Sequence, residues 1–147
     1  MKRFFIFFII AILLILVLVF PTETLEVSSH SFTCYTALNK TFSINYIHSV
    51  SRTKVIDTYL ANSSGIYFIE ERWQQFDAGQ PISFDEIKEG FFIKRKIIKM
   101  GNSCEYWFIP INNASINFDG KILRLNSGNL RFQVKIVPWI ITLILRC

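Results

Sequence analysis

The chain opens with a continuous apolar run, which is followed by short segments of alternating polarity. Residues 4–20 read FFIFFIIAILLILVLVF and contain no polar side chain. As a helix with a rise of about 1.5 Å per residue, this run would be about 26 Å long, close to the roughly 30 Å thickness of a hydrocarbon core. The pattern predicts one N-terminal transmembrane helix over residues 4–20.

The residues that flank this run predict its fate and its orientation. Lys2 and Arg3 precede it, Glu23 and Glu26 follow it, and no small-residue cleavage site comes after it. A retained signal-anchor is therefore favoured over a cleaved signal peptide. The positive-inside rule predicts a cytoplasmic tip of residues 1–3, with the bulk of the chain outside the cytoplasm on a single-pass protein of the cell membrane.

Strand patterns recur through most of residues 22–137. In the last of them Phe132, Val134 and Ile136 alternate with polar residues, so one face is buried and the other meets water. Turn signals separate these short segments, which is typical of a sandwich or barrel. The predicted strands cover residues 32–38, 42–49, 55–61, 66–73, 91–100, 104–111, 115–118, 121–125 and 130–137. We therefore expect one extracytoplasmic, antiparallel all-β domain over residues 22–137, folded as a sandwich or barrel.

Turn residues divide these strands, and two segments interrupt the alternation. Residues 62–65 and 119–120 predict hairpins, because Asn, Asp, Ser and Gly suit tight turns and most of them tolerate positive φ. Residues 76–81 form a loop with a glycine and a proline. Residues 83–90 carry acidic side chains without a strand pattern, and a helical turn is predicted there.

The tail, residues 138–147, is strongly apolar and reads PWIITLILRC. Ten residues are too few to cross a bilayer. The pattern favours a final buried strand over the alternative, a segment that lies on the membrane with Trp139 at the interface.

Charge and cysteine content fit an exported domain. Without Lys2 and Arg3, 14 basic residues face 11 acidic ones, a mild excess that suits an anionic membrane and does not argue for nucleic acid. Three cysteines lie on the exported side, where a disulfide persists. Cys34 and Cys104 are the candidate pair, and no cysteine or histidine spacing indicates zinc.

His48 is the leading candidate functional residue, because it ends an apolar strand face that contains Tyr46. An imidazole there could act as a base, hold a metal ion or bind a ligand. Asp57 and Asp77 are the nearest candidate acids, but their spacing indicates no metal site. Ser49 points to the opposite strand face and no nucleophile elbow occurs, so we assign no catalytic residue, metal or cofactor.

A structural role for His48 is favoured. A neutral imidazole donates one hydrogen bond and accepts another. The loop over residues 76–81 has Gly79, which permits unusual backbone angles, and Pro81, which restricts the residue before it. We expect His48 to face this loop and satisfy its backbone, with Asp57 as the alternative partner.

Several short motifs together resemble one known family. They are Tyr46-x-His48-Ser49-Val50, then Asp57 and Tyr59, then Trp73-Gln74-Gln75-Phe76-x-Ala78-Gly79-x-Pro81. This arrangement resembles the domain of unknown function 1850 family over roughly residues 25–137. The resemblance implies a small exported accessory of TRAP-type transporters, whose permeases work with solute-binding proteins of the TAXI kind. It implies no established activity.

Three functions are weighed on this basis. The first is a membrane-anchored accessory domain that binds a transporter permease or its solute-binding protein. The second is a β domain that binds a small ligand or lipid, with His48, Arg52 and Asp57 around a pocket. The third, a hydrolase or metalloenzyme, is disfavoured because the motifs for either are absent from the sequence.

Overall fold

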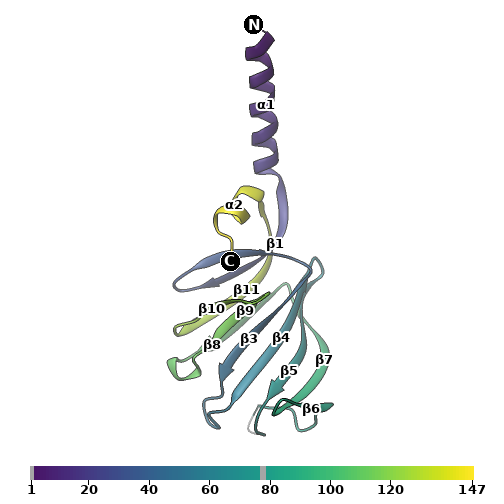
Figure 1. Cartoon of the computed structure of the whole chain (residues 1–147), viewed down its shortest axis with the longest axis vertical. Helices are drawn as coiled ribbons and strands as arrows, with labels where there is room; N and C mark the ends of the chain where they lie inside the picture. Colours follow the sequence, from purple (N-terminus) through teal and green to yellow (C-terminus); the bar gives the residue numbers. More distant parts are fainter. Residues whose placement is uncertain (1, 77–78) are drawn as a thin grey trace.

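The computed structural model describes residues 2–76 and 79–147, and it consists mainly of β-strands (Figure 1). A helix, α1 (Lys2–Val19), comes first, and a short helix, α2 (Trp139–Ile144), follows the last strand. The strands are β1 (Pro21–Ser29), β2 (Thr33–Ala37), β3 (Lys40–Ile47), β4 (Lys54–Asn62), β5 (Gly65–Trp73), β6 (Glu86–Lys88), β7 (Phe91–Gly101), β8 (Ser103–Phe108), β9 (Ser115–Phe118), β10 (Lys121–Arg124) and β11 (Gly128–Pro138), with a 3₁₀ turn, η1 (Pro110–Asn112), after β8.

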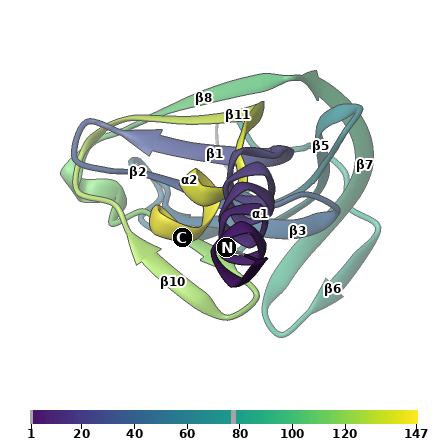
Figure 2. The same cartoon turned by 90° about the horizontal axis from the view of Figure 1, so that it is seen from above.

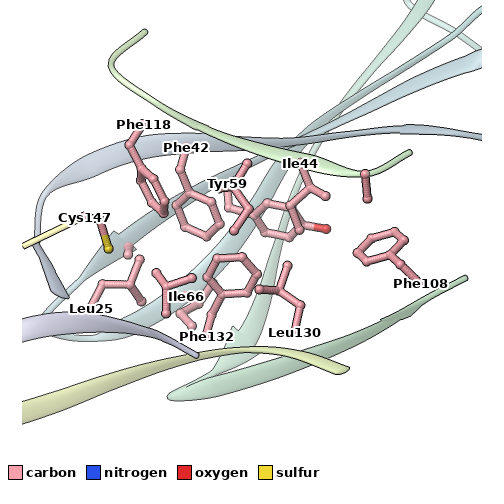
Figure 3. Packing of buried hydrophobic residues seen from close by; sticks show 14 residues of the cluster. Leu25, Phe42, Ile44, Tyr59, Ile66, Phe108, Phe118, Leu130, Phe132 and Cys147 are labelled. Carbon is pink, nitrogen blue, oxygen red and sulfur yellow. The ribbon is translucent and has the colours of Figure 1, made fainter. Parts of the chain in front are cut away.

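The strands form two antiparallel sheets that face each other. A four-stranded sheet has the order β2-β1-β11-β8, and a seven-stranded sheet has the order β10-β9-β3-β4-β5-β7-β6. Phe42 of the larger sheet stacks on Phe132 of the smaller one with ring centroids 4.7 Å apart, and Figure 3 shows this contact in the core. The predicted all-β antiparallel class is confirmed.

The N-terminal helix is present and stands away from the β domain (Figure 1). Most of its large apolar side chains are exposed, from 81% at Phe4 to 41% at Ile9, and Leu18 is partly buried. Among the described residues, no helix combines the length and the apolar character needed to cross a membrane. The expected helix is thus confirmed, and its membrane contact stays a prediction.

Strand β1 was not predicted from the sequence, yet it lies between β2 and β11 in the smaller sheet. It pairs with β11 over its whole length, from Pro21 opposite Pro138 to Ser29 opposite Leu130. Four successive residues, Thr24 to Val27, are buried, so no alternation marks the strand. Two contacts stabilise the buried carboxylate of Glu26: Lys135 Nζ lies 2.8 Å from it, and the Tyr35 hydroxyl donates to it at 2.9 Å.

Two predicted elements are wrong. Residues 83–90 contain the short strand β6 rather than a helical turn, because Asp85 accepts hydrogen bonds from the Arg95 backbone and from Lys94, and so holds this segment along β7. The tail is not a final buried strand. Strand β11 ends at Pro138, and the next six residues form α2.

The predicted Cys34–Cys104 disulfide is also wrong, because Cys34 pairs with Cys147 and Cys104 is free. Cys34 lies on β2 and Cys104 on β8, the two edges of the four-stranded sheet. Three strand spacings of about 4.8 Å separate them, which exceeds the reach of a disulfide. The tail instead runs beside β2, where Cys147 donates to the Tyr35 carbonyl at 3.0 Å.

Candidate functional site

The inner face of β4 carries one acidic residue among apolar ones. Val55, Asp57, Tyr59 and Ala61 are buried and alternate with partly exposed residues. The strand period therefore turns Asp57 toward the smaller sheet, and its side chain is only 7% exposed.

A second carboxylate, Glu71, lies directly opposite Asp57. The register of β4 and β5 pairs these two residues, so their side chains share a face and their Cβ atoms lie about 5 Å apart. Within the described part of the chain, neither carboxylate forms an ion pair with a lysine, arginine or histidine. Among the residues that the structure describes, the inner face thus holds two adjacent acids with no cation beside them.

Burial and mutual repulsion make these acids weak. Burial raises the pKa of Asp57 to about 7, the charge of Glu71 adds to this rise, and a hydrogen bond from Tyr46 partly offsets it. Burial also raises the pKa of Glu71, and a hydrogen bond from the Gln80 amide opposes that rise. Near neutral pH the pair therefore retains part of a proton that exposed acids would have lost.

Three tyrosines lie beside the acidic pair: Tyr59 is buried, and Tyr46 and Tyr106 are partly buried. Tyr46, from β3, donates to Asp57, while the hydroxyls of Tyr59 and Tyr106 hydrogen-bond to each other across the two sheets. Burial, reinforced by the charge of Asp57, raises the pKa of Tyr46 and of Tyr59, and it raises the pKa of Tyr106 as well. All three phenols are therefore neutral hydrogen-bonding groups.

Cys104 lies near these tyrosines on β8. Burial, and then the charge of Glu105, raise the pKa of the Cys104 thiol to about 11. A thiol with so high a pKa forms little thiolate, so it is a poor nucleophile.

We name the group formed by Tyr46, Asp57, Tyr59, Glu71 and Tyr106 the acid–tyrosine cluster.

His48 closes the turn between β3 and β4. Its backbone N–H donates to the Thr53 carbonyl at 2.8 Å, and its carbonyl accepts from Arg52 at 3.0 Å. The Ser51 backbone N–H lies 3.4 Å from its Nδ1 atom and the Ser51 hydroxyl 3.2 Å from it. These contacts agree with a structural role in this turn.

The register separates His48 from Asp57. Asp57 pairs with Ile44, four residues before His48, so it lies about 13 Å further along the strand. The expected contact of His48 with residues 76–81 involves positions 77 and 78, which lie outside the described residues. That contact stays a prediction.

Four other predicted site residues, Ser49, Arg52, Gly79 and Pro81, lie around the same end of the sandwich. Ser49 and Arg52 are exposed in the turn, and Arg52 adopts φ 61°. Gly79 is exposed with φ 95°, while Pro81 is partly buried. Asp77 lies outside the described residues. The structure does not gather Arg52, His48 and Asp57 around one point.

No metal centre is evident in the part of the chain that the structure describes. There, no group of three or more histidine, cysteine, aspartate or glutamate side chains is arranged to hold an ion. The two acids of the acid–tyrosine cluster, with the Gln80 amide, offer hydrogen-bond acceptors for a cationic group or a proton.

Sequence reasoning identified Asp57 but missed Glu71 and Tyr106. Asp57 occupies an apolar position of an alternating strand, and that position was the available signal that its carboxyl is buried. Glu71 carried no such signal, because the register shift of β5 near residue 69 obscures which face it occupies.

Comparison with known proteins adds one finding. A family described as Domain of unknown function (DUF1850) matches residues 42–125, more than half of the chain. The matched region begins in β3 and includes Asp57 and Glu71. No curated protein and no solved structure matches the chain.

Proposed function

The chain belongs to the family described as Domain of unknown function (DUF1850), and we propose on this premise that it is a membrane-anchored extracytoplasmic binding domain. The observation that carries the proposal is the uncovered apolar surface of α1. Most apolar side chains from Phe4 to Val19 are exposed, and the helix stands off the domain (Figure 1). Water solvates such a surface poorly, whereas its transfer into the apolar interior of a bilayer is favourable in free energy.

The Cys34–Cys147 disulfide supports an extracytoplasmic location for the β domain. Disulfides form and persist in oxidising compartments and are rare where thiol reductants are abundant. An anchor with Lys2 before it and Glu23 after it agrees with this orientation.

The partner that we propose is a TRAP-type permease or its solute-binding protein. The support is the family resemblance, together with a small domain held at the membrane, where it can contact both proteins. In this proposal the domain binds these proteins and performs no chemistry of its own.

Membrane anchoring is tested with one charge placed in α1. Leu14→Asp puts a carboxylate into the exposed apolar face, and we expect the variant to leave the membrane fraction. Ile82→Asp is the matched control, because Ile82 is 99% exposed on the β domain, and it should stay with the membrane. Equal retention of both variants after a carbonate wash would contradict the anchor.

Partner binding is tested by crosslinking in native membranes, followed by capture of the tagged full chain. Recovery of the permease or the solute-binding protein, identified by mass spectrometry, supports the proposal. Recovery of neither, in a preparation where wild-type anchoring is confirmed, overturns the transporter association.

A second candidate function, binding of a small cationic ligand, is favoured by the acid–tyrosine cluster. Asp57 and Glu71 have no cation beside them among the described residues. The Oε1 atom of Gln80, whose amide donates to Glu71, is buried and lacks a hydrogen-bond partner in the described structure. Three adjacent acceptors suit an ammonium or guanidinium group.

Thermal shift with a series of amines and guanidines tests this function. A binding compound should raise the melting temperature of the wild type and have no effect on Asp57→Asn or Glu71→Gln. Equal shifts in wild type and variants would show that the compound acts elsewhere.

A further inference from the structure

Helix α2 is fastened to the folded domain at both ends, yet part of its apolar surface is uncovered. The Trp139 N–H donates to the Phe20 carbonyl at 3.0 Å, and the Tyr35 N–H donates to the Leu145 carbonyl at 2.7 Å. The Cys34–Cys147 disulfide then locks the tail to β2. Even so, Leu143 is 47% and Ile144 is 69% exposed.

Helix α2 lies at the end of α1 nearest to the β domain (Figure 1), and the view from above shows it beside α1 (Figure 2). An apolar notch of about 420 Å³ lies between the last turns of α1 and Trp139. It is lined by Leu13, Leu16, Val17, Phe20, Thr22 and Trp139. The apolar surface of α1 therefore continues to Trp139, the first residue of α2.

We infer that α2 lies in the interfacial layer of the bilayer that holds α1, with Trp139 at the level of the headgroups and Leu143 and Ile144 directed into the acyl boundary. This inference rests on the proposed membrane anchoring. Short apolar helices with tryptophan commonly occupy this layer, where the indole ring meets both lipid and water.

The length of α1 supports a lipid surface as the occupant. Eighteen helical residues extend about 27 Å, slightly less than a hydrocarbon core of about 30 Å. Helix α1 alone is therefore shorter than the hydrocarbon core. The apolar residues of α2, at the end of α1 next to the β domain, lengthen the apolar surface in that direction.

The charges beside α2 also suit an anionic lipid surface. A second groove next to α2 is lined by Arg146 and the acid Glu23, and also by Lys40, which forms an ion pair with Asp119. Arg146 is exposed immediately after the apolar tail residues. Basic side chains at this level attract anionic headgroups.

Trp107 provides a matched control on the far side of the domain. It is 73% exposed, and it pairs with Asn129, nine residues before Pro138 on β11. At about 3.3 Å per strand residue, it lies roughly 30 Å from the start of α2. A bilayer that contacts α2 leaves Trp107 in water.

The test uses the oxidised full chain reconstituted into vesicles that contain phosphatidylglycerol and lipids brominated on the acyl chains. Wild-type tryptophan fluorescence should be quenched, Trp139→Phe should lose most of this quenching, and Trp107→Phe should keep it. Adding Ile144→Trp to Trp139→Phe should restore the quenching, which excludes misfolding as the cause of its loss.

Vesicle flotation separates this inference from the proposed anchoring. A chain that fails to float with the vesicles contradicts the anchor itself. A chain that floats, but in which Trp139→Phe is quenched as strongly as the wild type, overturns the interfacial position of α2 and leaves the anchor intact. Protection of Trp139 only when a partner protein is present would assign α2 to a protein interface and also overturn the inference.

Discussion

Asp57 is a residue whose environment opposes its charged state. Its carboxyl faces the interior and Glu71 lies opposite, and among the described residues the Tyr46 hydroxyl is the group that lowers its pKa. The unfolded chain ionises Asp57 near pH 4, whereas the folded chain does so near pH 7. Between these values the folded state binds more protons, so the free energy of unfolding falls as pH rises through this window.

Asp57→Asn should remove this pH dependence. Three pKa units correspond to about 4 kcal/mol, so the variant should gain stability over the wild type above pH 7 and differ little near pH 4. Urea unfolding between pH 4 and 8 measures the slope. Glu71→Gln should give an intermediate slope, because it removes the charge of Glu71 and leaves burial as the cause that raises the pKa of Asp57. Parallel profiles for wild type and Asp57→Asn would refute this account.

At the scale of elements, the tail depends on its covalent link to β2. Helix α2 has only six residues, too few for an isolated helix to be stable in water. The Cys34–Cys147 bond joins positions 113 residues apart, so it restricts the unfolded chain strongly.

Cys147→Ser should therefore lower the free energy of unfolding by about 2–5 kcal/mol and expose the tail to proteolysis. Cys104→Ser, which leaves the disulfide intact, is the control and should behave like the wild type in both assays. Thermal unfolding with and without reductant completes the measurement. If reductant destabilises Cys147→Ser as much as it destabilises the wild type, another bond is responsible.

For the whole molecule, the contact between the two sheets includes a polar link within an aromatic core. The Tyr59 hydroxyl on the larger sheet meets the Tyr106 hydroxyl on the smaller one. Their rings also lie edge to face, with centroids 6.0 Å apart. This pair holds β4 and β8 at one register across the sandwich.

A double-mutant cycle measures this link. Tyr59→Phe and Tyr106→Phe should each destabilise the domain, and the double variant should cost less than the sum by about 1 kcal/mol, because the second change removes a hydroxyl that is already unpaired. Tyr67→Phe combined with Tyr106→Phe should be additive, since the Tyr67 ring lies beneath Lys99 on β7. Additivity in the first cycle would mean that the two sheets do not meet through these hydroxyls.

The sequence by itself determined the features that depend on local periodicity. The run of residues 4–20 without polar side chains predicts a helix, and the bounds of α1 agree with it closely. Alternation predicted nine strands because one face of each is buried and the other is wet, and glycine-containing turns marked the hairpins at residues 62–65 and 119–120. Asp57 was singled out as a candidate partner of His48, and the register places it opposite Ile44 instead.

Only the tertiary structure decided the features that depend on distant neighbours. Strand β1 has acids in its sequence. The burial of Glu26 is stabilised by Lys135, which lies 109 residues later in the chain. The disulfide partner of Cys34 was set by strand order, which puts Cys104 at the opposite edge of the sheet. Glu71 lies beside Asp57 because the register of β4 and β5 places the two residues opposite each other. The contacts of Glu26 and of Cys34 join positions 109 and 113 residues apart, and the contact of Glu71 depends on the register of a hairpin. Local sequence patterns specify neither the distant contacts nor this register.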